Sequence, residues 1–143
     1  MTLKVLTEKD INLITSLYRE DFSDGWNSEM LLSAFKEGRF NAVGCFSEED
    51  LVGVITYTKG LDDADIEGIV TRSSFRNKGI ATLLFDFAKE DIKKSGIEKI
   101  LLEVRESNFS AISFYKKQGF EEISVRKKYY ADGENALIFV KEI

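Results

Sequence analysis

A nearly continuous apolar segment around residue 100 places the strongest limit on how this chain can fold. The segment from Lys99 to Arg105 reads Lys-Ile-Leu-Leu-Glu-Val-Arg, and an amphipathic helical pattern lies on each side of it. Strands of this kind are typical of parallel sheets, in which helices cover both faces and bury the strand between them. The segment therefore predicts an α/β fold with crossover helices and a strand that is buried on both sides.

Apolar spacing along the rest of the chain predicts further strands and helices around this segment. The predicted order is one strand, two helices, three strands, a helix, a strand, a helix and two strands. Gly68 indicates a bulge or a close backbone approach within its strand. Thr7, with Asp10 three residues later, is expected to cap the first helix, which continues to about 21. The other predicted helices cover 28–37, 78–95 and 109–118, and the predicted strands cover 2–6, 40–46, 51–57, 64–71, 99–105, 120–126 and 135–141.

Length and composition predict one domain over residues 1–143. The chain is 43% apolar, which is enough for a buried core at this size. No apolar run reaches the roughly 18 residues that a membrane span needs, and the N-terminus lacks a signal-peptide pattern. Cys45 is the single cysteine. A lone cysteine fits a reducing compartment, so we expect a cytoplasmic protein without a membrane partner.

The absence of histidine removes several classes of active site. The chain has no His and one Cys, which excludes Ser-His-Asp and Cys-His arrangements, HExxH metal sites and thiolate metal clusters. We therefore expect no metal cofactor. The net charge is −5, and a nucleic-acid partner is disfavoured because phosphate binding needs a basic face.

Charge is distributed unevenly between the two halves of the chain. Residues 1–75 contain 7 basic and 14 acidic side chains, whereas residues 76–143 contain 13 basic and 11 acidic ones. This asymmetry suggests a cationic ligand at the first half and an anionic ligand at the second. Random variation between solvated faces is the alternative interpretation.

Residues 69–82 carry the clearest indication of a ligand. A strand ends at Thr71, a polar loop follows, and a helix starts near Gly79. The first amides of a helix lack helical partners and lie at its positive end, so they attract anions. Arg76 and Lys78 add positive charge, and Gly79 allows a phosphate to approach the backbone. The segment matches neither GxxxxGK[ST] nor GxGxxG, and an ordinary loop before a helix is the alternative.

Glu103 is the unusual residue of the apolar strand. An apolar environment would raise its pKa and make it a proton acceptor near neutral pH. The alternative is that it reaches solvent or an ion pair at the end of the strand.

Asn108 and Tyr115 belong to the following helix. Asn108 is expected to cap that helix, and its amide could also bind a ligand. A phenol such as Tyr115 can protonate a thiolate leaving group, although core packing is the commoner role of a helical tyrosine.

Together these segments resemble the GNAT superfamily of acyl-CoA-dependent N-acyltransferases, and more narrowly its ribosomal-protein-alanine N-acetyltransferases of the RimI type. The resemblance implies a mixed, splayed central sheet of about seven strands with about four helices. It is carried by Arg76-x-x-Gly79-x-Ala81, Leu102-Glu103-Val104-Arg105, Ser107-Asn108, Ala111, Phe114-Tyr115, Gly119-Phe120, Arg126-Lys127-Lys128-Tyr129-Tyr130 and Asp132-Gly133.

The resemblance implies direct transfer of acetyl from acetyl-CoA to a protein N-terminal amine. Glu103 matches the proton acceptor of the family and Tyr115 its proton donor. In the family, the strand end binds the thioester arm and polarises the carbonyl through a backbone N–H, while the loop and helix start hold the pyrophosphate. The implied coenzyme-binding residues are Ile69, Val70, Thr71, Arg76, Asn77, Lys78, Gly79, Ile80, Ala81, Thr82 and Asn108.

The acidic first half fits the basic N-terminus of a ribosomal protein as acceptor. The subfamily often has Pro before the Trp, whereas Asp24-Gly25 precedes Trp26 here, which predicts a more flexible loop between Asp21 and Ser28. The steering acids would be Asp21, Asp24 and Glu29, and Trp26, Tyr57, Tyr129 and Tyr130 would either line the peptide slot or pack in the core.

Two alternative functions remain open. The same fold could acetylate a small-molecule amine such as a polyamine or an aminoglycoside, or it could bind acetyl-CoA without turnover.

Overall fold

The structure is a computed structural model that describes residues 1–21 and 26–143, without the side chain of Asp21. The strands are β1 (Thr2–Leu6), β2 (Phe40–Ser47), β3 (Asp50–Lys59), β4 (Asp63–Thr71), β5 (Lys99–Arg105), β6 (Glu121–Arg126) and β7 (Ala136–Glu142). The helices are α1 (Ile11–Asp21), α2 (Ser28–Lys36), α3 (Ile80–Lys94) and α4 (Phe109–Lys117), with short 3₁₀ turns η1 (Glu8–Asp10) and η2 (Ser73–Phe75). This element order confirms the predicted one.

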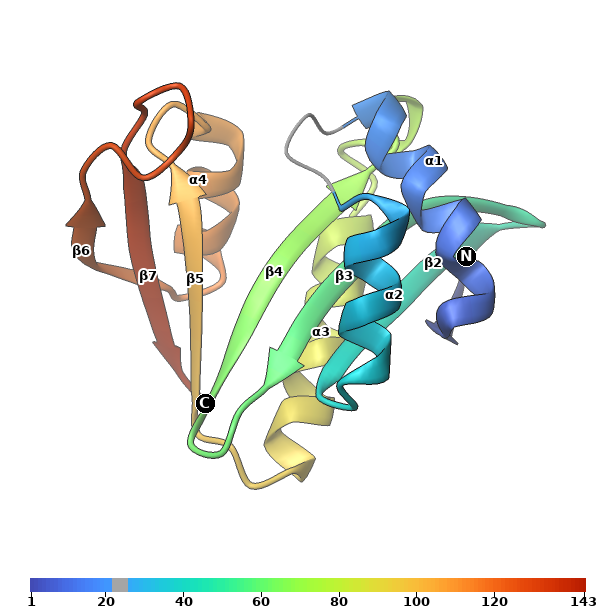
Figure 1. Ribbon diagram of the computed structural model, residues 1–143, viewed down its shortest axis with the longest axis horizontal. Coiled ribbons are helices and arrows are strands. Elements are labelled where there is room, and N and C mark those ends of the chain that lie inside the picture. Colours follow the sequence, from blue (N-terminus) through green and yellow to red (C-terminus); the bar gives the residue numbers. More distant parts are fainter. Residues whose placement is uncertain (22–25) are drawn as a thin grey trace.

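The seven described strands form one sheet in the order β1-β2-β3-β4-β5-β7-β6 (Figure 1). Neighbouring strands are antiparallel except β4 and β5, which are parallel and are joined by the crossover helix α3. The predicted mixed, splayed α/β sheet is therefore confirmed. None of the described helices is long and apolar enough to span a membrane.

Capping residues in the sequence determine where several of these helices begin. Thr7 and Asp10 form the predicted capping box, in which the Thr7 hydroxyl accepts from the Lys9 N–H and Asp10 accepts from the Thr7 N–H. The box caps η1, which leads directly into α1. Asn108 caps α4 by accepting from the Ala111 N–H at 3.2 Å.

The sheet opens between β4 and β5. Their paired register covers Asp63 to Ile66 against Lys99 to Leu102, whereas β5 pairs with β7 along its whole length. Opposite β3, the register jumps from Ile66 to Gly68, so Glu67 is an extra residue in β4. This is the bulge predicted from Gly68. A bulge bends its strand, and beyond it β4 and β5 diverge into a V (Figure 1).

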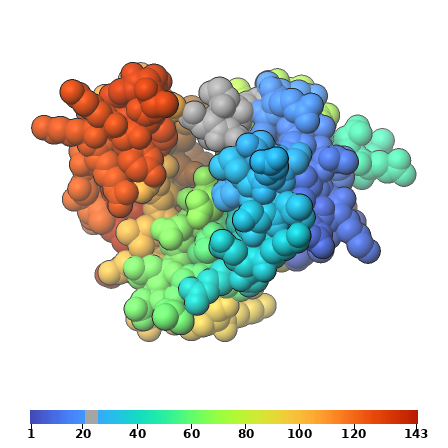
Figure 2. Space-filling view, viewed as in Figure 1, coloured from blue at the N-terminus to red at the C-terminus, as the bar shows by residue number. Residues whose placement is uncertain are grey.

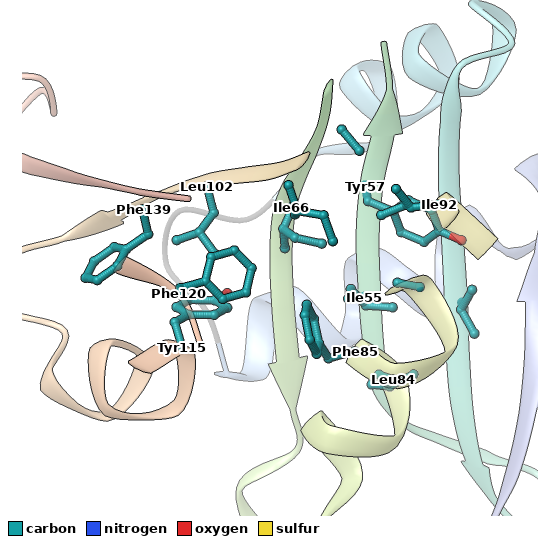
Figure 3. Packing of buried hydrophobic residues seen from close by; sticks show 14 of the residues in the cluster. Ile55, Tyr57, Ile66, Leu84, Phe85, Ile92, Leu102, Tyr115, Phe120 and Phe139 are labelled. Atoms are coloured by element: carbon teal, nitrogen blue, oxygen red, sulfur yellow. The ribbon is translucent and has the colours of Figure 1, made fainter. Parts of the chain in front are cut away.

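Two apolar clusters cover the two faces of the sheet. The larger one lies between the sheet and α3, with Tyr115 and Phe120 packed beside Leu102 (Figure 3). The smaller one lies between the sheet and the pair α1 and α2, and it includes Tyr18 and Leu31.

Only one face of β5 is buried, so the prediction of burial on both sides is wrong. Ile100, Leu102 and Val104 enter the larger cluster, whereas Lys99 and Glu103 are exposed on the opposite face. The reason is tertiary: α1 and α2 pack over β2, β3 and β4 and leave the second face of β5 uncovered (Figure 1).

We predict that Phe85→Ala destabilises the fold far more than Phe87→Ala on the same helix. Phe85 is 0% exposed and stacks edge-on against Phe120 with ring centroids 5.6 Å apart, whereas Phe87 is 38% exposed. Truncation of a buried Phe costs about 3–5 kcal/mol because it leaves a cavity. Urea denaturation measures both free energies of unfolding, and equal losses for the two variants would contradict this packing.

Candidate active site

A cavity of about 720 Å³ lies where β4 and β5 separate. One wall consists of the end of β4, the loop after it and the first turn of α3, and the other wall is α4. The lining residues are Ile69, Val70, Thr71, Phe75, Arg76, Asn77, Gly79, Ile80, Ala81, Thr82, Asn108, Ser110, Ala111, Ser113, Phe114, Tyr115, Lys117 and Gln118.

The cavity brings together most of the residues that the sequence singled out for the coenzyme. Lys78 is the exception, because it does not line the cavity and its Nζ lies 5.1 Å from the centroid of the Phe75 ring. On the α4 wall, Asn108 and Tyr115 are predicted site residues, whereas Ser110, Ser113 and Lys117 are not. Ser110, Ser113 and Lys117 recur at helical spacing, which was an available signal for a polar helix face.

The start of α3 forms one end of the cavity. Gly79 has φ +79° and Asn77 has φ +63°, and these left-handed conformations turn the chain into the helix. A Cβ atom at Gly79 would meet nothing within 4 Å, so the space in front of this backbone is open. The amides of Ile80, Ala81 and Thr82 belong to the first turn and lie at the positive end of the helix dipole. Phosphate groups fit such an arrangement.

The end of β4 directs backbone amides into the gap. The Arg72 N–H donates to the Val52 carbonyl across the β3–β4 ladder at 2.8 Å. Because successive amides of a strand point to opposite edges, those of Ile69 and Thr71 point away from β3, towards β5. The Arg76 Nε donates to the Thr71 carbonyl at 3.3 Å. The Ile69 and Thr71 amides are therefore placed to polarise a carbonyl held in the gap.

Tyr115 lies on the α3 side of the sheet. Its side chain is 7% exposed, with its ring centroid 5.5 Å from that of Phe114 and 5.6 Å from that of Phe120. Burial raises the pKa of the hydroxyl well above its usual value, and this keeps the phenol protonated at neutral pH. Tyr115 can therefore act as a proton donor.

Glu103 lies on the opposite face of the sheet, because it alternates with the buried Leu102 and Val104. Its side chain is 32% exposed and lies 3.5 Å from Nη1 of Arg126, measured from Oε1. The Tyr129 hydroxyl donates a hydrogen bond to Glu103, and this bond is the largest cause of a raised pKa at Tyr129. Of the two alternatives predicted for Glu103, the structure supports the second, in which the side chain reaches solvent and an ion pair.

Two further carboxylates lie near Glu103. The pKa values of Asp65 and Glu67 are raised, mainly by desolvation and partly by the negative charge of Glu103. Glu67 also accepts a hydrogen bond from the Thr58 hydroxyl at 3.1 Å. A cation placed among these carboxylates would relieve their mutual repulsion. Among the described residues, no group of three or more His, Cys, Asp or Glu is placed to hold a metal ion.

The surface is hollowed between the β6–β7 loop and the helices α1 and α2 (Figure 2). Of the aromatic residues expected around this recess, Tyr129 and Tyr130 belong to the β6–β7 loop. Trp26 packs 5.1 Å from Phe40, between ring centroids.

Tyr57 is not part of this recess. It is 1% exposed on the α3 side and its hydroxyl donates to Asp91 at 2.5 Å, so of its two predicted alternatives Tyr57 takes the place in the core. Glu29 is exposed in the first turn of α2. Asp24 and the side chain of Asp21, the other two expected steering acids, lie outside the described part of the chain.

Comparison with known proteins identifies the family. The sequence profile described as "Acetyltransferase (GNAT) family" matches residues 11–120. A Bacillus subtilis protein named putative [ribosomal protein bS18]-alanine N-acetyltransferase is 32% identical over 133 residues, which are 91% of this chain and 87% of that protein. An N-alpha-acetyltransferase of Saccharolobus solfataricus is 39% identical over 79 residues, and these cover 54% of this chain but only 47% of that longer protein.

The fold has a solved counterpart. The crystal structure of the ribosomal-protein-S18-alanine N-acetyltransferase from Escherichia coli superposes with a TM-score of 0.91 at 25% identity, over 99% of this chain and 93% of that one. With the profile match over most of the chain, the chain belongs to the acetyltransferase (GNAT) family and is an acetyl-CoA-dependent N-acetyltransferase.

Proposed function

We propose that this protein, acting as one domain over residues 1–143, transfers acetyl from acetyl-CoA to the N-terminal amine of a protein, with an alanine N-terminus of a ribosomal protein as the acceptor. One observation carries the proposal. Tyr115 and Glu103 lie on opposite faces of the sheet at the point where β4 and β5 separate, so a proton donor and a proton acceptor flank one gap. The name of the Bacillus relative supports the choice of acceptor.

The cavity fits acetyl-CoA. Its length along β4 and α4 suits an extended arm, and the first turn of α3 together with Arg76 suits a pyrophosphate. Lys117 places a second cation on the α4 wall. When bound, acetyl-CoA supplies the activated acetyl group.

The residues at the gap would carry the proton transfers. Glu103 accepts a proton from the α-ammonium of the acceptor. The pKa of that group is about 8, so a weak base is enough to remove its proton. The freed nitrogen attacks the acetyl carbon, so that the N–C bond forms as the C–S bond breaks. The Ile69 and Thr71 amides stabilise the carbonyl oxygen as it gains negative charge. Tyr115 donates its proton to the departing sulfur, and the second proton that the nitrogen loses as the amide forms returns through solvent to the Tyr115 oxygen.

The acceptor would enter through the recess on the α1–α2 side. Asp65, Glu67 and Glu103 present negative charge there, which attracts an α-ammonium and a basic N-terminal segment. Small polyamines carry the same type of charge, so the acceptor class needs a direct test.

We expect a single acetyl group on the α-amine of an Ala-starting basic peptide incubated with the protein and acetyl-CoA. The same peptide with a blocked N-terminus, but with its lysines intact, is the control and should gain none. Mass spectrometry with fragmentation locates the acetyl group. Acetylation at lysine only, or faster turnover of a polyamine than of the peptide, would overturn the proposal.

Glu103→Gln should lower turnover by roughly 10²–10³-fold, because the amide cannot accept the proton. The optimum pH should rise, since only acceptor that is already deprotonated can react. Glu98→Gln is a matched control at the exposed residue before the same strand. Initial rates across pH test this, and an unchanged profile for Glu103→Gln would leave the residue a structural role only.

Tyr115→Phe should slow the chemical step by about 10²-fold while the affinity for coenzyme A stays within about twofold. The reason is that phenylalanine keeps the packing against Phe114 and Phe120 and loses only the proton donor. Single-turnover kinetics and calorimetry measure the two quantities. An equal loss of both would indicate a packing role instead.

Gly79→Val should weaken coenzyme A binding by at least about tenfold. The added side chain occupies the open space before the helix start and strains a left-handed residue. Gly96→Val is the matched control, because Gly96 has φ +81° and open surroundings at the other end of α3. Both changes strain the backbone, and calorimetry should show lost affinity at Gly79 alone. Equal affinities of the two variants would contradict the site.

A further inference from the structure

The connection between β6 and β7, residues 127–135, contacts Arg105 at the end of β5, and the Glu106 N–H after that strand donates to the Asn135 carbonyl at 3.2 Å. Nη1 of Arg105 lies 2.8 Å from Oδ2 of Asp132 and 2.8 Å from Oε2 of Glu134. The other oxygen of Glu134 accepts from the Ser107 N–H at 2.8 Å, and the Glu134 N–H donates to Asp132 at 3.0 Å. The Arg105 side chain is only 23% exposed, and the Asp132 and Glu134 carboxylates that it contacts both belong to the connection.

Arg105 also contacts the tyrosine pair of this connection. Its Cζ lies 4.0 Å from the centroid of the Tyr130 ring, in a cation–π arrangement. The Tyr130 ring in turn packs edge-on against Tyr129, with ring centroids 5.1 Å apart. The backbone is folded tightly here, because the Gly133 N–H donates to the Tyr130 carbonyl at 2.9 Å. Contacts therefore run without a break from Arg105 through Tyr130 to Tyr129.

Tyr129, at the end of this series, lies beside the proposed base Glu103. The Arg126 guanidinium lies 5.6 Å from its ring centroid and 3.5 Å from Oε1 of Glu103, and hydrogen bonding to Glu103 is the largest cause of the raised pKa of Tyr129. Glu103 and Arg105 are two residues apart on β5, so their side chains share one face of the strand. The same strand thus presents the proposed base and the residue that fixes the tyrosine beside it.

We propose that Arg105 is a positioning residue for the acceptor: it holds the 127–135 connection so that Tyr129 stays beside Glu103 and completes the slot for the incoming amine. This rests on the proposed function and extends it by a residue that touches neither the coenzyme cavity nor the reacting atoms. Hydrogen bonds from Ser107 and Arg105 lower the pKa of Glu134, so the carboxylate that Arg105 contacts remains charged at neutral pH.

The role requires arginine rather than any cation. A guanidinium is planar, so it donates to two carboxylates in its plane and stacks on a ring with its face at the same time. A lysine ammonium can donate to both carboxylates, as Nη1 of Arg105 does, but it has no flat face to stack on the Tyr130 ring at the same time. Arg105→Lys should therefore fail to restore what Arg105→Gln removes.

The test compares acceptor and coenzyme parameters in four variants: Arg105→Gln, Arg105→Lys, Tyr129→Phe and the double variant Arg105→Gln/Tyr129→Phe. Arg105→Gln and Arg105→Lys should each raise the KM for the Ala-starting peptide by about tenfold, with the Kd for coenzyme A within about twofold of wild type. The double variant should be no worse than the poorer single one, because both changes remove the same placement of Tyr129. Arg39→Gln, at an exposed arginine between α2 and β2, is the control.

A second measurement does not depend on activity. Trypsin should cut after Lys127 or Lys128 several times faster in Arg105→Gln than in wild type or Arg39→Gln, because the connection opens more often. Glu134→Gln removes one of the two carboxylates that Arg105 contacts, so it should also raise the peptide KM and the rate of trypsin cleavage. This variant replaces Arg105→Gln in the test if Arg105→Gln does not fold.

The outcomes separate this inference from the proposed function. Failure of the wild-type protein to acetylate any peptide overturns the proposed function and the slot with it. Normal wild-type transfer with an unchanged peptide KM in Arg105→Gln overturns the role of Arg105 alone. Equal losses for peptide and coenzyme, full rescue by lysine or additive effects in the double variant would likewise overturn it.

Discussion

The separation of β4 from β5 is the constraint on which the rest of the site depends. Parallel pairing stops after four residue pairs, and the extra residue Glu67 bends β4 away from its neighbour. Backbone amides that would otherwise pair within the sheet are thereby left pointing into a gap. The cavity between β4 and α4 exists because the strands part there, and the start of α3 lies at one end of it. A continuous sheet would have satisfied the same amides and closed the cavity.

The alternation of side chains along β5 separates two chemical environments that could not share one face. Leu102 and Val104 join the apolar cluster in which Tyr115 is buried, and burial favours the neutral, protonated phenol. Glu103 and Arg105 point to the other face, where charged and polar partners surround them. An apolar environment favours a neutral phenol and penalises a charged carboxylate, so the placement of Tyr115 and Glu103 on opposite faces suits both groups.

The charged groups of the site are brought together by the fold, and they do not divide between the first and second halves of the sequence. The asymmetry between residues 1–75 and 76–143 predicted separate cationic and anionic ligand regions, and the cavity cations Arg76 and Lys117 do come from the second half. The carboxylates of the acceptor side come from both halves, because Asp65 and Glu67 lie beside Glu103. Strand order, and not sequence distance, puts these three groups on one face.

The sequence by itself determined the features that depend on a few consecutive residues. The capping box at Thr7, the cap at Asn108, the bulge at Gly68 and the anion-binding helix start at Gly79 all follow from local backbone chemistry. Tertiary structure alone decided which face each strand residue meets. It buried Tyr57 against α3, gave Glu103 charged neighbours and set Arg105 against Asp132 and Glu134, 27 and 29 residues away. Such contacts depend on strand order and on which helices cover which face, and no short stretch of sequence contains that information.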